Sequence, residues 1–63
     1  MPFVEVSWFE GRSKEQKAEL ARRITDAVCE VGVCQHQDVE VLFRDVHRGD
    51  WWQDAREVGA PPA

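Results

Sequence analysis

The chain has 63 residues, of which 12 are acidic and eight are basic, and its formal net charge is −4. This negative balance argues against nucleic acid as a partner, because nucleic-acid sites need a basic patch. A single domain of this size, residues 1–63, buries a small fraction of its surface, so such chains usually need disulfides, a metal or oligomerisation. Cys29 and Cys34 are too close in sequence to supply a disulfide framework. Oligomerisation is therefore the predicted source of stability.

The cellular location and the absence of a metal are also expectations from the sequence. No signal peptide precedes the first apolar residues, and no apolar run approaches the length of a membrane span. We therefore expect a cytoplasmic protein with reduced thiols and no membrane partner. The two cysteines do not have zinc-finger spacing with His36 or His47, so we expect no metal site.

A strand is predicted over residues 3–9, where the side chains alternate between two faces. One face carries Val4, Val6 and Trp8, and the other carries Phe3, Glu5, Ser7 and Phe9. Glu10 and Gly11 then make a turn. Ser13, with Gln16 three residues later, has the pattern of a capping box, which predicts that a helix begins at about Lys14.

The helix is predicted to bury one apolar stripe, because its apolar residues recur at helical spacing. These residues are Leu20, Ile24, Ala27, Val28 and Val31. Gly32 is expected to end the helix, since glycine readily adopts the left-handed conformation found at helix ends. A loop over residues 33–37 follows.

A second strand is predicted over residues 38–46, with Val39, Val41 and Phe43 on one face and Glu40, Leu42 and Arg44 on the other. This order of elements predicts an α/β fold of one β-α-β unit, whose parallel strands are joined by a right-handed crossover. The helix would cover the face that carries the valines of both strands. The opposite face, with Phe3, Phe9 and Leu42, has no covering segment, so this face and the sheet edges are predicted subunit interfaces.

The remainder of the chain is predicted to be irregular. Residues 47–50 are expected to form a turn, and residues 51–58 a short extension or hairpin that packs on a neighbouring subunit. The adjacent Trp51 and Trp52 are a large apolar load for so small a protein. From about residue 59 the chain is expected to be a flexible tail.

Pro2 is the first candidate for catalysis. Inside a chain its nitrogen is an amide without a hydrogen, which cannot transfer protons. Removal of Met1, which is usual before a small residue, would turn this nitrogen into a secondary amine. An α-amino group has a pKa near ~8, and nearby cations or apolar surroundings lower it. Such an amine suits a general base at neutral pH.

Arg12 is the second candidate, because it lies where the helix begins. The free N–H groups at a helix start favour anions, and an arginine can pair with a carboxylate through two parallel hydrogen bonds. The alternative is that Arg12 pairs with one of the many surface acids. Its role is therefore either carboxylate binding or surface pairing.

The chain resembles the 4-oxalocrotonate tautomerase family of small enzymes. The resemblance extends from Pro2 to about Trp51 and includes the β-α-β length. Its specific part is the strand led by proline, followed by Glu10-Gly11-Arg12-Ser13 and Glu15-Gln16-Lys17. In that family the terminal proline moves a proton between oxygen and carbon positions of an enol acid, and no cofactor takes part.

This resemblance implies roles for four residues. Pro2 would be catalytic, and Arg12 would bind a substrate carboxylate, often from a neighbouring subunit. Trp51 would form the apolar wall of the site, with help from Phe9. The family also implies a homohexamer built as a trimer of dimers, and a small enol or unsaturated 2-oxo carboxylate as substrate.

The chain departs from this family at Glu40. The best-studied members have a second arginine there, which binds the other carboxylate of the substrate, so Glu40 would repel a dicarboxylate unless it is protonated or pairs with Arg44. Arg44 and Arg48 are the remaining candidates for the second cation. The glycine-rich hairpin of the family is replaced by Trp52-Gln53-Asp54, which should reshape the pocket.

Other functions stay open. Related superfamily members hydrate unsaturated or halogenated acids with a protonated proline as acid and a carboxylate that activates water, a role open to Glu40 or Asp54. Alternatively, the chain is a non-catalytic assembly module, or one subunit of a hetero-oligomer in which a paralogous chain supplies the missing arginine. A retained Met1 would favour the non-catalytic role.

Overall fold

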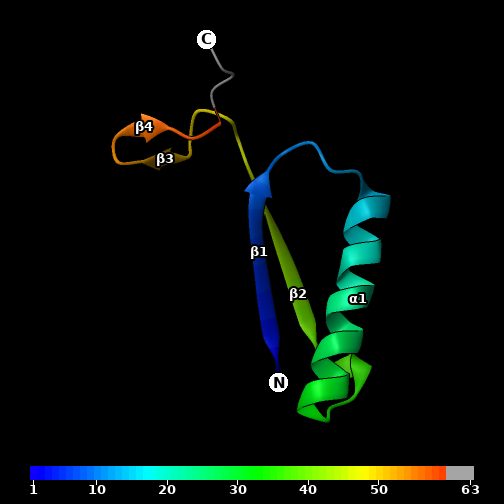
Figure 1. Ribbon diagram of the computed structural model, residues 1–63. Helices are drawn as coiled ribbons and strands as arrows, with labels where there is room; N and C mark the ends of the chain where they lie inside the picture. The colour runs from blue at the N-terminus through cyan, green and yellow to red at the C-terminus, as the bar shows by residue number, and fades with distance from the viewer. Residues whose placement is uncertain (60–63) are drawn as a thin grey trace.

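Two parallel strands lie at the centre of the fold, and one helix covers one of their faces (Figure 1). The computed structural model describes residues 1–59. Its elements are β1 (Phe3–Phe9), α1 (Lys14–Gly32), a 3-10 helix η1 (His36–Asp38), β2 (Glu40–Val46), β3 (Trp52–Gln53) and β4 (Arg56–Glu57). The predicted β-α-β unit with parallel strands is therefore confirmed. Among these residues, no helix has the length and apolar character that a membrane span requires.

The turn and the helix start form as the sequence predicts. Gly11 has a φ of 127°, a conformation that side chains with a Cβ atom rarely adopt. The Ser13 hydroxyl accepts a hydrogen bond from the Gln16 backbone N–H at 3.1 Å. The Gln16 side-chain oxygen accepts one from the Ser13 backbone N–H at 2.9 Å. This capping box satisfies two N–H groups that have no partner inside the helix, so α1 begins at Lys14.

The apolar stripe of α1 is narrower at its carboxyl end than predicted. Leu20, Ile24 and Val28 are half-buried against the sheet side, but Ala27 is exposed and Val31 is 85% exposed. The prediction that Ala27 and Val31 belong to the stripe was therefore wrong for the isolated chain. The half-buried helix positions also include Lys17, Ala21, Thr25 and Cys29, so the covered face is rotated from the predicted one.

The end of α1 differs from the prediction by one residue. Gly32 is the last helical residue, and Val33 takes the left-handed conformation, with a φ of 55°. The Val33 N–H donates to the Cys29 carbonyl, which supports the turn that glycine was expected to make. The predicted loop contains η1, and β2 begins at Glu40 rather than at residue 38 because Asp38 belongs to η1.

The parallel pairing aligns Phe3 with Glu40 and Phe9 with Val46. On the helix side of the sheet, Trp8 and Phe43 stack with ring centroids 5.1 Å apart. On the opposite face, Phe3 is 57% exposed and Leu42 is 40% exposed. The prediction that this face carries exposed apolar side chains is confirmed for these two residues.

The isolated chain lacks a closed core. Among residues 1–59, no side chain is fully buried. The radius of gyration is 14.9 Å, against about 11 Å expected for a compact domain of this length. The hairpin of β3 and β4 contributes to this shape, because it projects away from the sheet and the helix (Figure 1). These features support the expectation that the chain needs neighbouring subunits.

The predicted hairpin over residues 51–58 is present as the antiparallel pair β3 and β4. The preceding turn is closed by a hydrogen bond from the Asp50 N–H to the His47 carbonyl at 2.9 Å. Gly59, which the sequence assigned to the tail, is half-buried in a turn, and a Cβ atom there would lie 3.0 Å from the Phe9 ring. The rest of the predicted tail, residues 60–63, lies outside the described residues.

Candidate active site

The predicted catalytic residues lie at opposite ends of β1. Pro2 precedes the first residue of this strand, and Arg12 follows its last residue, Phe9. The six steps from Phe3 to Phe9 span about 20 Å at a rise of about 3.3 Å per residue. One chain therefore cannot place Pro2 and Arg12 on the same small molecule, and its two candidate residues lie at separate ends of the sheet.

At the carboxyl end of the sheet, Arg12 is held by the strand that precedes it. Its Nη1 atom donates to the Phe9 carbonyl at 2.9 Å. Its guanidinium lies over the Trp8 ring, 4.8 Å from the centroid. The Trp8 indole N–H in turn donates to the Asp45 carboxylate at 3.0 Å. These contacts orient a cation that has no ion pair within residues 1–59.

Arg48 lies on the other side of the same site. Its guanidinium lies 4.5 Å from the centroid of the Phe9 ring, and Phe9 contacts Trp51 with centroids 5.1 Å apart. A cavity of about 290 Å³ lies between the two arginines and is lined by Glu10, Gly11, Arg12, Gln16 and Arg48. The structure thus brings Arg12, Arg48, Phe9 and Trp51 to one end of the sheet.

One carboxylate also lines this cavity. Glu10 Oε2 lies 2.6 Å from His47 Nδ1, so the acid already has a hydrogen-bonding partner from the turn after β2. Beside this carboxylate, the Arg12 and Arg48 side chains also line the cavity. An anionic ligand would find complementary charge there.

At the amino end of the sheet, Pro2 lies beside Glu40. The Pro2 carbonyl accepts a hydrogen bond from the Glu40 backbone N–H at 3.0 Å, which places the two residues on neighbouring strands. Within residues 1–59, the exposed Glu40 carboxylate makes no ion pair. The pairing of Glu40 with Arg44 considered from the sequence does not occur, because Arg44 lies four residues along the strand and pairs with Glu5 at 2.8 Å.

Asp45 and Lys17 are contributors that the sequence interpretation missed. The Lys17 ammonium lies 2.6 Å from Asp45 Oδ2 and joins α1 to β2. Its hydrogen bond lowers the pKa of Asp45 below the ordinary value of 3.8, and the Trp8 N–H and the Arg12 charge act in the same direction. No sequence pattern marks this contact, because 28 residues separate the two partners. Asp45 thereby supports Trp8, on which Arg12 stacks.

We expect Asp45→Asn to destabilise the protein most near neutral pH. The folded-state pKa of Asp45 is lowered, so its ion pair contributes stability above the unfolded-state pKa and loses it as the pH falls through the folded-state pKa. The difference between variant and wild type should therefore shrink below about pH 4. Urea unfolding of both proteins at a series of pH values, at one protomer concentration, measures this difference in stability. Asp50→Asn is the matched control. An equal loss of stability of Asp45→Asn at every pH would contradict the predicted dependence on the Asp45 charge.

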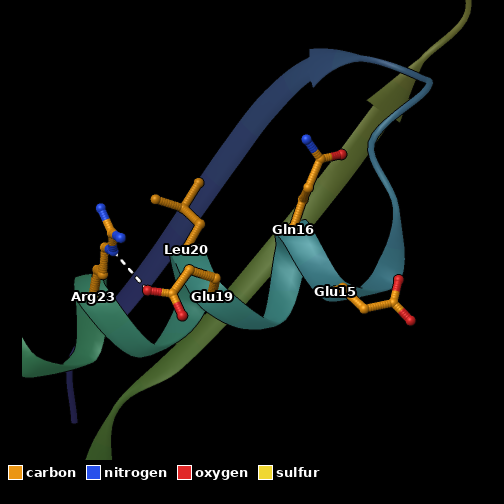
Figure 2. A pocket seen from close by; sticks show the side chains of 5 residues that line it. All are labelled: Glu15, Gln16, Glu19, Leu20 and Arg23. Carbon is orange, nitrogen blue, oxygen red and sulfur yellow. Dashed lines mark hydrogen bonds and ion pairs between the residues drawn. The ribbon is translucent and has the colours of Figure 1, made fainter.

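A second cavity, of about 400 Å³, lies on the first half of α1 and shares only Gln16 with the cavity between the two arginines. Figure 2 shows its five lining side chains, all from the helix: Glu15, Gln16, Glu19, Leu20 and Arg23. Glu19 pairs with Arg23 at 2.7 Å, and the hydrogen bond from Arg22, followed by that from Arg23, lowers the pKa of Glu19. Glu19 and Arg23 are thus engaged with one another, whereas Gln16 is bonded to Ser13.

Comparison with known proteins identifies the family. Residues 2–60 match the family model described as tautomerase enzyme. The chain belongs to the tautomerase family. A probable tautomerase of Streptococcus thermophilus is 42% identical over 52 residues, which cover 82% of this chain and 85% of the relative. A probable tautomerase of Streptococcus agalactiae is 40% identical over 52 residues, with 82% and 87% covered.

Solved structures give the same result for this tautomerase-family chain. The heterohexamer 4-oxalocrotonate tautomerase from Chloroflexus aurantiacus is similar with a TM-score of 0.82 and 30% identity, over 90% of this chain and 92% of that one. The resemblance to 4-oxalocrotonate tautomerases, stated from Pro2 and Glu10-Gly11-Arg12-Ser13, is therefore confirmed for the family and the fold. The roles of individual site residues remain proposals.

Proposed function

We propose that this tautomerase-family protein is a cofactor-independent isomerase that interconverts the enol and keto forms of a small enol or unsaturated 2-oxo carboxylate. The observation that carries the proposal is the position of Arg12 and Arg48 around one cavity, beside the Phe9 and Trp51 rings. Guanidinium groups bind carboxylates through paired, charge-assisted hydrogen bonds. The aromatic pair offers an apolar wall for an unsaturated carbon chain.

Pro2 supplies the proton transfer in this proposal. After removal of Met1, its secondary amine takes the proton from the enol hydroxyl, and the resulting ammonium returns a proton to carbon, which leaves the keto acid and the free amine. An α-amino group has a pKa near ~8, and a cation-rich site lowers it toward neutrality. The two arginines of such a site would act in this direction.

The site is assembled from more than one protomer. Pro2 and Arg12 of one chain are separated by the length of β1, so the proposal joins Pro2 of one subunit with Arg12 of another. The exposed Phe3 and Leu42 side chains offer an apolar face for such an assembly. We propose a homohexamer, in keeping with the family resemblance.

Arg48 takes the place of the second cation in this proposal. Arg48 lines the cavity together with Arg12, whereas Arg44 lies along the strand and is paired with Glu5. Arg48 would bind the 2-oxo group or a second carboxylate, and Trp51 would shape the wall through Phe9.

We expect Arg12→Ala and Arg48→Ala each to raise KM for a 2-oxo enol acid by about 10- to 150-fold, the value of a lost hydrogen bond to a charged group. Steady-state ketonisation, followed by ultraviolet absorbance, measures the change. Arg44→Ala is the matched control, because it removes one arginine from the same chain outside the cavity, and its KM should stay within about twofold. If Arg48→Ala behaves like Arg44→Ala, Arg48 is not the second cation.

A hydratase is the second candidate, and one observation favours it. Glu40 lies beside Pro2, and its carboxylate has no ion pair within residues 1–59. Such a carboxylate could activate water while a protonated Pro2 donates a proton to the unsaturated acid. Asp54 lies in the β3–β4 turn at the other end of the sheet, so it would reach Pro2 only from a neighbouring subunit.

Glu40→Gln separates the two candidate reactions. If the protein is an isomerase, ketonisation should change by less than about threefold, because Glu40 transfers no proton in it. A hydratase should lose about 10²–10⁴-fold of its hydration rate with the same change, the usual contribution of a general base. Hydration of an unsaturated or halogenated acid, followed by product analysis, and ketonisation are measured on the same preparations.

A hetero-oligomer is a variant of the isomerase proposal. It is supported by the similarity to a heterohexamer 4-oxalocrotonate tautomerase and by Glu40 in the position of the family's second-strand arginine. A paralogous chain would then supply that arginine. A purified chain that forms an active hexamer alone would argue against this variant. A chain that retains Met1 and shows neither activity would instead favour a non-catalytic assembly module.

A further inference from the structure

We propose that Cys29 and Cys34 form a redox-active dithiol site, which a low-molecular-weight disulfide of the glutathione class oxidises to an intramolecular disulfide. The two Sγ atoms lie 3.2 Å apart, and both side chains are half-buried. A disulfide bond is about 2.05 Å long, so closing it requires a movement of about 1 Å. The proposal does not depend on the isomerase function.

The backbone brings the two thiols together. After α1 ends, Val33 adopts the left-handed conformation and the chain turns back. The Val33 and Cys34 N–H groups both donate to the Cys29 carbonyl, the latter at 3.4 Å. The spacing of five residues would separate the thiols in a continuous helix, whereas this turn places them in contact.

The two cysteines have different roles in the oxidation. Burial, followed by the hydrogen bond with Cys34, raises the pKa of the Cys29 thiol to about 11. Cys29 is therefore a poor first nucleophile, and Cys34 attacks. Its thiolate forms a mixed disulfide with one half of the oxidant and releases the other half as a thiolate. Cys29 then loses its proton, attacks Cys34 Sγ and releases the second half. Two thiols lose two electrons and two protons, and one disulfide of the oxidant becomes two thiols.

The position of this dithiol site connects it with the amino end of the sheet. From Cys34 the chain passes through η1 to Glu40, whose N–H donates to the Pro2 carbonyl. A disulfide would fasten the segment that leads into this hydrogen bond. The site therefore lies at the opposite end of β1 from Arg12.

The test is oxidation of the folded full-length chain by oxidised glutathione, followed by alkylation of free thiols and intact-mass measurement. We expect the wild type to lose two hydrogens, to carry no alkyl group and to recover both thiols with dithiothreitol. Cys29→Ser should stop at a glutathione adduct on Cys34, which traps the first step. Cys34→Ser should react at least tenfold more slowly, because only Cys29 remains.

Three outcomes would overturn the proposal. In the first, both cysteines of the wild type are still alkylated after the treatment. In the second, the wild type accumulates the glutathione adduct, and in the third, the disulfide forms between two chains. The same oxidation in urea tests whether the folded geometry is responsible. We expect the folded chain to need at least a tenfold lower ratio of oxidised to reduced glutathione than the unfolded chain, and equal ratios would also contradict the inference.

Discussion

A chain that keeps any residue before Pro2 is expected to lose tautomerisation by about 10²–10⁴-fold, the usual contribution of a general acid–base group. An amide nitrogen has no basic lone pair, so an extended or unprocessed chain lacks the proposed proton carrier. Intact mass gives the state of Met1, and ketonisation kinetics give kcat for the processed and extended forms.

The matched control for this prediction carries the same extension at the carboxyl end. Its kcat should equal that of the processed chain, and light scattering should show the same assembly for both extended forms. Full activity of the amino-terminally extended chain would remove Pro2 from the mechanism. Pro2→Ala is a weaker test, because alanine also has an amine when Met1 is removed.

Mixed assemblies test whether Pro2 and Arg12 act from different subunits. At a substrate concentration well below the raised KM of the Arg12→Ala variant, a chain with a blocked Pro2 and a chain with Arg12→Ala should each show little activity alone. Co-expression should restore part of the activity, because some sites then combine an intact Pro2 from one chain with an intact Arg12 from the other. Recovery would not occur if each chain supplied both groups to its own site.

The second large effect is expected at the uncovered face of the sheet. Leu42→Asp should convert the proposed oligomer into a monomer that unfolds without a cooperative transition. Leu42 is 40% exposed on the face opposite α1. In the isolated chain, no side chain among residues 1–59 is fully buried. Burial of one such side chain is worth about 1.5–3 kcal/mol, and a charge placed in an apolar interface adds a desolvation cost.

Light scattering and thermal unfolding at several protomer concentrations measure this effect, since the stability of an oligomer depends on concentration. Val31→Asp is the matched control. Val31 is 85% exposed near the end of α1 and away from the sheet, so the same change there should leave assembly intact. A Leu42→Asp chain with the mass and melting temperature of the wild type would show that this face is not the interface.

Local patterns in the sequence predicted the elements of the fold with small errors. The alternation over residues 3–9 and the capping box of Ser13 and Gln16 depend on neighbours in the chain, and both are confirmed. The end of α1 was placed one residue early, because Val33 rather than Gly32 takes the left-handed conformation. The start of β2 was also misplaced, since a one-turn η1 has no strong sequence signal.

The arrangement of the site required the tertiary structure. The sequence by itself determined the family, the β-α-β fold and the candidate residues Pro2 and Arg12. It did not show that β1 holds those two residues at opposite ends, because a strand of seven residues extends about 20 Å. It also did not separate Arg48, which shares a cavity with Arg12, from Arg44, which pairs with Glu5.

Contacts between residues far apart in the chain explain this division. Asp45 bonds to Trp8 across 37 residues and to Lys17 across 28, and neither partner is marked by a local pattern. The contact between Cys29 and Cys34 is short in sequence, yet it depends on the turn after α1. Propensity, capping and alternation are set by neighbouring residues, whereas parallel pairing decides which distant side chains meet.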